Sequence, residues 1–315
     1  MNTVSRTAMV FPGQGAQYVG MGLDIYREFP VARAVFDMAD EVLGFSLSKL
    51  CFEGPEDRLR QTENVQPAIV TLSLALLTTI RKSRRSVQAS FTAGHSLGEY
   101  SALAAAGAMT AAAAIRLARK RGELMQQAGA ASPGAMAAVL GLDEQAIDTI
   151  CHETGVYIAN YNSPGQIVIS GNSIGIEAAG NLAVARGARK VLPLQVSGAF
   201  HTPYMEPAAE GLALALADVT WTEPEIPVIA NTTGEPLHSI SGIQQELTVQ
   251  LTHPVKWQQS IETLVRLGVD TFIEIGPGKV LSGLIKRIDG AVNTVNVSDA
   301  ISLREYIEKD RADEV

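Results

Sequence analysis

The feature that most constrains the fold is the pentapeptide Gly94-His95-Ser96-Leu97-Gly98, which has the G-x-S-x-G pattern of a nucleophile elbow. A strand-like run at 89–93 precedes it, and an Ala- and Leu-rich run at 97–106 follows it and stops at Gly107. Strand, sharp turn and helix in that order place a serine hydroxyl at the end of a sheet, and the glycines let the strand and helix approach closely. Ser96 is therefore the candidate nucleophile, at a helix N-terminus whose free N–H groups stabilise negative charge. An ordinary glycine turn is the alternative interpretation.

Composition limits the class of protein. The chain has 315 residues, of which 46% are hydrophobic and 18% charged, so it can build a sizeable core as one large domain or two unequal ones. A net charge of −8 argues against nucleic acid as the main partner. The apolar runs are too short or too polar for a membrane span. Cys51 and Cys151 have no metal-like spacing, so we expect no metal site and a reducing cytoplasm.

Strands alternate with helices along most of the chain, which predicts a mainly parallel sheet covered on both faces. Strands are expected at 7–11, 89–93, 226–231 and 271–275, and helices at 26–43, 66–80, 97–106, 111–127, 202–217, 256–267 and after 276–278. Thr110 is the predicted N-cap of the helix that follows it. The charge-rich stretch 302–315 is expected to be a surface helix with a frayed end.

A different order of elements begins near Gly134. Strands are expected at 135–140, 156–160, 166–170 and 190–196, with helices at 144–153 and 174–186. This β-α-β-β-α-β order is ferredoxin-like. We therefore expect an α/β fold: a large α/β-hydrolase-like domain with a parallel sheet core, residues 1–132 and 200–315, and an inserted ferredoxin-like subdomain, residues 133–199.

A serine nucleophile needs a base, and the chain offers His95, His152, His201, His238 and His253. His201 is favoured because it precedes Thr202-Pro203, a predicted N-cap with proline at N1, where the chain re-enters the large domain beside a cleft. The side chain of His95 should point away from the serine beside it. No local acid is nominated to orient the base, and a backbone carbonyl could hold the imidazole instead.

Arg121 is a charge on the apolar side of its helix, since it shares a face with Leu117, Leu124 and Met125. A buried guanidinium needs an anionic partner. That partner is either an internal Glu or Asp or the carboxylate of a substrate, which arginine binds well in a bidentate fork.

The loop Phe11-Pro12-Gly13-Gln14-Gly15 follows a strand at the sheet edge where α/β proteins bind ligands. A backbone N–H of this loop, with that of Leu97, could form an oxyanion hole. Read alone, the loop is only a turn.

Together these residues resemble the malonyl-CoA:acyl carrier protein transacylase family over about residues 7–290. The motifs that carry the resemblance are FPGQG at 11–15, QPA at 66–68, GHSLGEYSAL at 94–103, RGELM at 121–125, GAMA at 134–137, NSPGQ at 162–166, GAFHT at 198–202 and GPGKVL at 276–281.

The resemblance implies a role for each matching position. Ser96 would be the acylated nucleophile and His201 its base, with Arg121 pairing with the malonyl carboxylate. The amides of Gln14 and Leu97 would form the oxyanion hole. The backbone carbonyl of Gln250 would orient the histidine and so take the place of the acid that the sequence does not nominate. The residues implied to line the site are Gln66, His95, Asn162, Phe200 and Asn231. In this family Phe before the histidine goes with malonyl, and a small residue there with methylmalonyl.

The implied activity is ping-pong transfer of malonyl from malonyl-CoA, through an ester on Ser96, to the phosphopantetheine thiol of an acyl carrier protein, without a bound cofactor. Fatty acid or polyketide synthesis is the expected setting, in a cytoplasmic monomer without nucleic acid or membrane partners. A basic patch for the acidic carrier protein is expected at 186–190 or 279–287, although both could be ordinary solvated faces. The alternatives are a malonyl transferase of a malonate decarboxylase system, an acyl-carrier hydrolase, a serine esterase of the α/β-hydrolase type, and a non-catalytic carrier-binding module.

Overall fold

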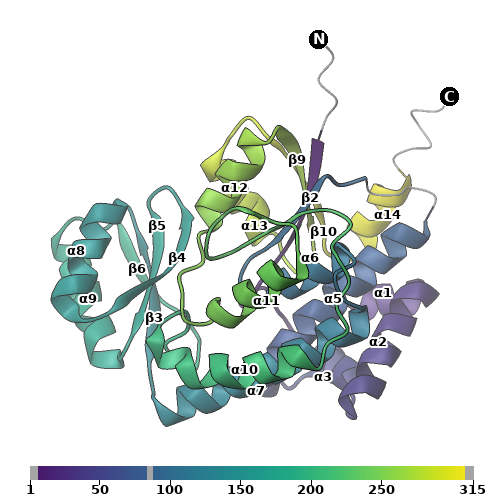
Figure 1. Ribbon diagram of the computed structural model, residues 1–315, viewed down its shortest axis with the longest axis horizontal. Coiled ribbons are helices and arrows are strands. Elements are labelled where there is room, and N and C mark those ends of the chain that lie inside the picture. Colours follow the sequence, from purple (N-terminus) through teal and green to yellow (C-terminus); the bar gives the residue numbers. More distant parts are fainter. Residues whose placement is uncertain (1–5, 84–87, 309–315) are drawn as a thin grey trace.

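Two sheets organise the computed structural model, which describes residues 6–83 and 88–308. The larger sheet has the strand order β10 (Asn293–Val297), β9 (Val269–Ile275), β1 (Arg6–Phe11), β2 (Phe91–Gly94), β7 (Val228–Ile229) and β8 (Pro236–Leu237). The smaller sheet has the order β4 (Tyr157–Ser163), β5 (Gln166–Gly171), β3 (Ala135–Leu140) and β6 (Lys190–Pro193). Figure 1 shows the smaller sheet with its two helices on one side of a larger body, which contains the first and the last of the described elements.

The larger sheet is parallel except at one edge, as predicted. Its strands are β1 (Arg6–Phe11), β2 (Phe91–Gly94), β7 (Val228–Ile229), β9 (Val269–Ile275) and β10 (Asn293–Val297), and β8 (Pro236–Leu237) joins β7 in antiparallel fashion. Phe11 and Gly94, the last residues of β1 and β2, are register partners. The loop after β1 and the turn after β2 therefore leave the sheet at the same edge.

Helices cover both faces of this sheet, and β1 shows how. Met9 and Phe11 belong to one buried cluster with residues of the helices α2 (Pro30–Leu43), α5 (Thr62–Lys82) and α6 (Gly98–Ala105). Ala8 and Val10 belong to another cluster with residues of α12 (Trp257–Arg266) and α13 (Val280–Ile288). Alternate residues of a strand point to opposite faces, so β1 is buried on both. The helices of this body are α1 (Leu23–Glu28), α2 (Pro30–Leu43), α3 (Leu47–Glu53), α4 (Glu56–Arg60), α5 (Thr62–Lys82), α6 (Gly98–Ala105), α7 (Ala111–Ala131), α10 (Glu206–Ala217), α11 (Ile240–Val249), α12 (Trp257–Arg266), α13 (Val280–Ile288) and α14 (Ala300–Glu308), with a short 3₁₀ helix η1 (Pro203–Met205).

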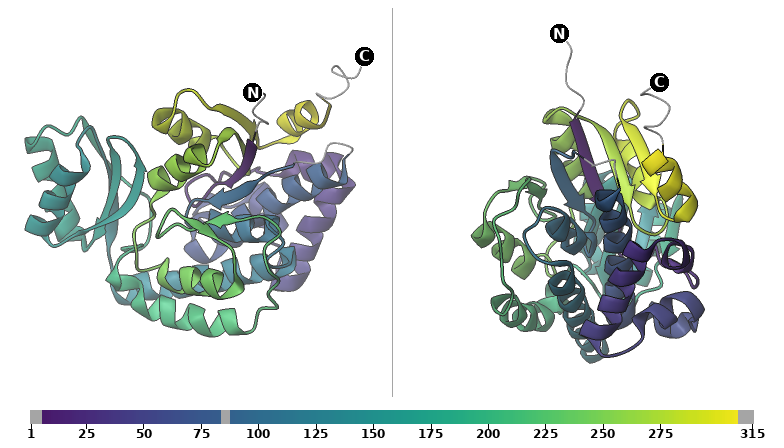
Figure 2. Two further views of the ribbon diagram at one scale, coloured as in Figure 1. Left: turned by 45° about the horizontal axis from the view of Figure 1, so that its top comes forward. Right: turned by 90° about the vertical axis from the view of Figure 1, so that its right-hand side faces the viewer.

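The smaller sheet is antiparallel and ferredoxin-like in order. It comprises β3 (Ala135–Leu140), β4 (Tyr157–Ser163), β5 (Gln166–Gly171) and β6 (Lys190–Pro193). Helices α8 (Glu144–Thr154) and α9 (Ser173–Ala185) pack on the face turned away from the larger body, as Figure 1 and the left-hand view of Figure 2 show, and they share a buried cluster with this sheet around Ile147 and Ile176. All four strands lie within 133–199, and the exact domain boundaries stay a prediction.

The structure corrects several predicted elements. The helix expected at 26–43 is two helices, because Pro30 forces Phe29 into an extended conformation (φ −115°, ψ 106°) and begins α2. The strand expected at 190–196 ends at Pro193, and that expected at 226–231 keeps only Val228–Ile229. Strand β7 is cut short because the backbone of Asn231 turns out of the sheet. The Asn231 N–H donates to the Glu99 carboxyl, and the Asn231 carbonyl oxygen accepts from the Lys256 N–H. Helices α3, α4 and α11 and strands β8 and β10 were not predicted.

Other predictions are confirmed. Thr110 caps α7 by accepting a hydrogen bond from the Ala113 N–H, and Thr202 caps η1 with Pro203 at its start. The helix expected at 66–80 is buried along nearly its whole length, although it begins earlier, at Thr62. Of the helix expected at 302–315, α14 covers the first part, and residues 309–315 lie outside the described residues. Within the described ranges, no helix is both long enough and apolar enough to span a membrane.

The turn between β2 and α6 has the geometry of a nucleophile elbow. Ser96 has a φ of 51°, in the left-handed region that residues other than glycine rarely adopt. A Cβ on Gly94 would lie 1.9 Å from the carbonyl carbon of Gly98, and one on Gly98 would lie 2.1 Å from the Phe11 carbonyl oxygen. Strand β1, strand β2 and helix α6 thus meet with no room for side chains at these two positions.

We therefore expect Gly94→Ala to lower the free energy of unfolding by more than about 3 kcal/mol, because its new methyl group meets backbone atoms that cannot move aside. Denaturant unfolding measures the change. Gly283→Ala is the matched control: Gly283 lies exposed within α13 with open space at its Cβ position, so alanine should leave stability unchanged or raise it by up to about 1 kcal/mol. Equal effects of the two substitutions would contradict the close packing of the elbow.

Candidate active site

Ser96, His201 and Gln250 form a continuous hydrogen-bonded chain. The Ser96 Oγ lies 2.8 Å from His201 Nε2, and His201 Nδ1 lies 2.9 Å from the backbone carbonyl oxygen of Gln250. A carbonyl oxygen can only accept, so Nδ1 carries the proton and Nε2 is free to accept one from the serine. The carbonyl thus holds the imidazole in the tautomer of a general base, which an aspartate does in many serine enzymes.

His201 is held in an unusual backbone conformation and in its neutral form. Its φ is 60°, so both members of the serine–histidine pair are left-handed residues. Burial and the positive charge of Arg121 lower the pKa of His201 to about 3, against the opposing effect of its bond to Gln250. A neutral imidazole is the form that can take a proton from serine.

The guanidinium of Arg121 lies beside the serine and is almost completely buried. Its Nη1 donates to Gln66 Oε1 at 2.8 Å, and its Nη2 donates to Gln250 Oε1 at 3.0 Å and to Ser96 Oγ at 3.1 Å. The Arg121 Nε has no hydrogen-bond partner among the residues that the structure describes. None of the ion pairs found among the described residues includes Arg121. The internal ion pair considered from the sequence is therefore absent, and this cation is held by neutral oxygens.

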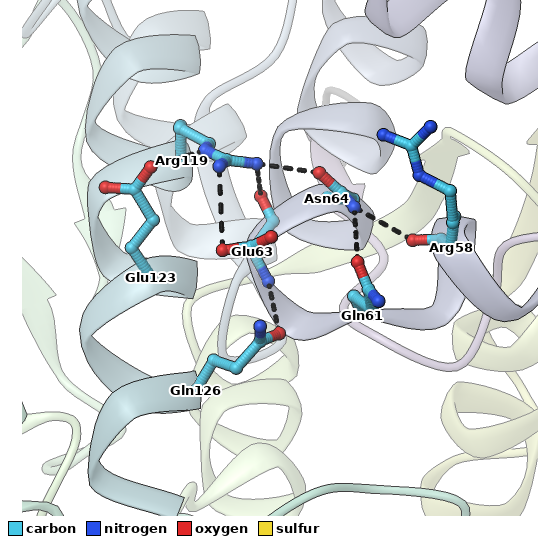
Figure 3. Close-up of polar contacts among 7 residues, drawn as sticks. All are labelled: Arg58, Gln61, Glu63, Asn64, Arg119, Glu123 and Gln126. Atoms are coloured by element: carbon cyan, nitrogen blue, oxygen red, sulfur yellow. Dashed lines mark hydrogen bonds and ion pairs between the residues drawn. The ribbon is translucent and has the colours of Figure 1, made fainter. Parts of the chain in front are cut away.

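Helices α5 and α7 fix the position of this cation. A Cβ on Gly122 would lie 2.5 Å from the Thr62 carbonyl oxygen, so the two helices touch beside Arg121. Around the same contact, Arg119 pairs with Glu63 and Glu123 and donates to Asn64, as Figure 3 shows. This network ties the start of α5 to α7.

Gln250 connects all the groups around the serine. Besides its carbonyl bond to His201, its side-chain oxygen accepts from Arg121, and its Nε2 donates to the Ser96 carbonyl oxygen at 3.1 Å and to the carboxyl of Glu99. Burial and the nearby Glu246 raise the pKa of Glu99 well above its ordinary value, against the bonds from Gln250 and Asn231 and the charge of Arg121.

Asn231 braces the elbow from behind. Its Oδ1 accepts the Ser96 N–H at 2.6 Å, and its Nδ2 donates to the Gly94 carbonyl oxygen at 2.7 Å. The Ser96 N–H is therefore engaged and is not free for a substrate. The next amide, that of Leu97 at the start of α6, and that of Gln14 in the loop after β1 stay the predicted oxyanion-hole donors.

His95 links the two sheets. Its Nε2 lies 2.8 Å from Asn162 Oδ1 in β4, and its ring packs 5.5 Å from the ring of Trp257. Burial lowers the pKa of His95. The side chain thus turns toward the smaller sheet, and this contact helps to hold β4 over the elbow.

A cavity of about 550 Å³ lies between the two sheets and contains this site. Of the predicted site residues, those on its wall are Gln14, His95, Ser96, Arg121, Asn162, Phe200 and His201. The other four, Gln66, Leu97, Asn231 and Gln250, are buried behind the wall. Gln66, Asn231 and Gln250 reach the site through their bonds to Arg121, Ser96 and His201.

The sequence reasoning missed two groups that the structure places here. Glu99 follows the elbow closely, and a carboxyl in the first turn of a buried helix was the signal available. Trp257 gave no comparable signal. Among the described residues, no group of three or more His, Cys, Asp or Glu could hold a metal ion.

Comparison with known proteins adds independent findings. A family described as acyl transferase domain matches residues 8–309. The chain is similar to the malonyl CoA-acyl carrier protein transacylase of Bacillus subtilis, 47% identical over 94% of each chain, and to that of Escherichia coli, 42% identical over 94% of this chain and 96% of the other.

Solved structures of malonyl transferases are also similar to this chain in fold and in sequence. One is a type II PKS acyl-carrier protein in complex with its malonyl-transacylase, with a TM-score of 0.93, 41% identity and coverage of 97% of this chain and 100% of the other. Another is an acyl carrier protein S-malonyltransferase from Vibrio cholerae, with a TM-score of 0.92, 42% identity and coverage of 96% and 100%.

The lowered pKa of His201 predicts the pH dependence of Ser96 reactivity. If His201 is the base, as predicted, only its unprotonated form can activate Ser96. A pKa far below 6.5 then means that the rate of Ser96 labelling by a sulfonyl fluoride should show no drop from histidine protonation between pH 8 and pH 5. In Arg121→Gln, which removes a repelling positive charge, the acid limb should move to higher pH. Rates of labelling, followed by intact mass, test both. A wild-type limb near pH 6.5 would show that His201 is not held neutral in this way.

Proposed function

The chain belongs to the acyl transferase family, and from that premise we propose that it transfers a malonyl group from malonyl-CoA to the phosphopantetheine thiol of an acyl carrier protein, in fatty acid or polyketide synthesis. The activity follows the curated relatives, which are malonyl CoA-acyl carrier protein transacylases at good identity over nearly the whole chain. The observation that connects this activity to particular residues is Arg121: a buried cation on the cavity wall, 3.1 Å from the serine oxygen, whose hydrogen-bond partners among the described residues are all neutral. Such a cation is suited to an acyl group that ends in a carboxylate.

The proposed reaction has two matching halves. The Ser96 Oγ attacks the thioester carbonyl of malonyl-CoA while His201 Nε2 takes its proton. The N–H groups of Leu97 and Gln14 stabilise the oxyanion. The intermediate collapses, CoA leaves as a thiol with the proton from His201, and malonyl stays on Ser96 as an ester. The phosphopantetheine thiol then gives its proton to His201 and attacks the ester carbonyl, and the Ser96 oxygen leaves as its bond to the acyl carbon breaks and takes that proton back.

The carrier protein would approach where α13 borders the cavity. Val280, Leu281 and Leu284 of this helix lie on the cavity wall, and Arg287 near its end donates to Gln166 of β5 at 2.6 Å. Arg287 therefore bridges from α13 to the smaller sheet beside the cavity, which favours 279–287 over 186–190, where Arg186 is paired with Glu153. An acidic carrier protein would be attracted to this edge.

Three further expectations complete the proposal. We propose that the enzyme acts without a bound cofactor, because serine, histidine and arginine supply every step of the transfer. A cytoplasmic location suits Cys51 and Cys151, which are both unpaired thiols. A monomer would suffice, since one chain supplies every residue invoked.

The decisive experiment detects the acyl-enzyme. We expect intact mass to show a malonyl adduct on Ser96 after incubation with malonyl-CoA, and loss of the adduct when a carrier protein with a phosphopantetheine thiol is added. In Arg121→Ala the preference for malonyl-CoA over acetyl-CoA should fall by about a hundredfold, because a charge-assisted bidentate contact is worth about 3 kcal/mol.

Arg119→Ala is the matched control, since Arg119 lies on the same helix and pairs with Glu63 and Glu123 rather than facing the cavity. It should keep the preference. A wild-type adduct that water hydrolyses as fast as it forms, with no transfer to any carrier protein, would favour the acyl-carrier hydrolase instead.

Phe200 is expected to limit the size of the acyl group. It lies on the cavity wall directly before the base, and a smaller side chain leaves room beside the malonyl α-carbon. We expect Phe200→Ser to raise the rate with methylmalonyl-CoA relative to malonyl-CoA by about tenfold, the scale that one methyl group in an apolar pocket provides. Competition between the two thioesters, read by intact mass, gives the ratio. An unchanged ratio would mean that pocket size at this position is not the control.

A further inference from the structure

Glu99 is a buried carboxyl that the reaction does not use. It lies in the first turn of α6 and its side chain is inaccessible to solvent. Its two oxygens face different N–H donors: Oε1 accepts from the Asn231 backbone N–H at 3.3 Å, and Oε2 accepts from Gln250 Nε2. Burying such a group is costly, so a carboxyl here calls for an explanation.

The partner that matters is the side-chain amide of Gln250, whose two ends have almost the same shape but opposite hydrogen-bonding character. Its oxygen faces Arg121, and its nitrogen faces the Ser96 carbonyl oxygen and Glu99. If the amide were reversed, its NH₂ would face the guanidinium, donor against donor, and its oxygen would face two acceptors.

We propose that Glu99 is a positioning residue for substrate selection: it fixes the amide of Gln250 with the oxygen toward Arg121, and so holds the guanidinium where it receives the malonyl carboxylate. This inference rests on the proposed malonyl transfer and extends it to a residue that touches neither substrate nor serine side chain. Glu99 acts entirely through Gln250.

A carboxyl is the group that this position requires. In Glu99→Gln the side chain keeps its shape, but only one of its ends is an acceptor, while both sites face N–H donors. Either Asn231 or Gln250 then meets an NH₂ group. If the NH₂ faces Gln250, the amide of Gln250 is driven to reverse, and its nitrogen repels Arg121.

The measurement is the rate of Ser96 acylation by malonyl-CoA divided by that by acetyl-CoA, followed by intact mass. A merely structural role would slow both substrates alike and leave this ratio unchanged. We expect Glu99→Gln to lower the ratio by roughly tenfold or more, the scale of one lost hydrogen bond to a charged group. A thermal melt checks that the variant is folded.

Glu246→Gln is the matched control. Glu246 is also buried, but its carboxyl is bonded to the backbone N–H and the hydroxyl of Thr232. A hydroxyl can donate or accept, so a glutamine satisfies this site. The ratio should stay at the wild-type value.

A double-mutant cycle with Gln250→Met tests the route of the effect. Methionine removes the amide but keeps the backbone carbonyl that holds His201, so this variant should show the lowered ratio by itself. Adding Glu99→Gln to it should lower the ratio no further, and this comparison remains informative if either single variant is less stable. A further fall in the double variant, or an unchanged or raised ratio in Glu99→Gln, would overturn the proposal. Failure of the proposed function is distinguishable, because the wild-type protein would then form no malonyl adduct.

Discussion

The structure around the cavity depends on a buried guanidinium that is bonded to neutral oxygens. Burying Arg121 without a counter-ion is unfavourable, and burial accordingly lowers the pKa of this arginine. Three elements bring oxygens to it: Gln66 from α5, Ser96 from the elbow and Gln250 from the end of α11. The ring of Tyr100 lies 5.6 Å from the cation. The packing of α5, α6 and α7 therefore serves to hold one positive charge next to the nucleophile.

The same charge sets the state of the base. Burial and the charge of Arg121 both lower the pKa of His201, so the imidazole is held in its neutral form. A malonyl carboxylate bound to the guanidinium would oppose that repulsion as His201 takes the serine proton. In the proposed reaction, substrate recognition and base strength would therefore be coupled through Arg121, and an acyl group without a carboxylate would lack this second advantage.

The sequence could predict those site residues that are unusual for the local pattern in which they stand. Ser96 stands between two glycines before a helix, Arg121 is a charge on an apolar face, and His201 follows the smaller unit's last strand at a capped turn. The sequence does not mark Glu99 as a site residue, because carboxylates are common in the first turn of a helix. Its role depends on Asn231 and Gln250, which are distant in sequence and meet it only in the folded chain. Likewise, Pro30 could have predicted the break between α1 and α2, whereas the early end of β7 follows from tertiary bonds of Asn231.

The choice of amides around Arg121 has a physical reason. A glutamate in place of Gln66 or Gln250 would pair with the guanidinium directly and would compete with any carboxylate substrate. A side-chain amide offers an oxygen that orients the cation yet carries no charge. The Glu99 carboxyl lies one group further away, where it bonds to the amide of Gln250 rather than to the arginine. The cation is therefore positioned by neutral oxygens, and the side of the guanidinium that faces the cavity still lacks the anionic partner that malonyl would bring.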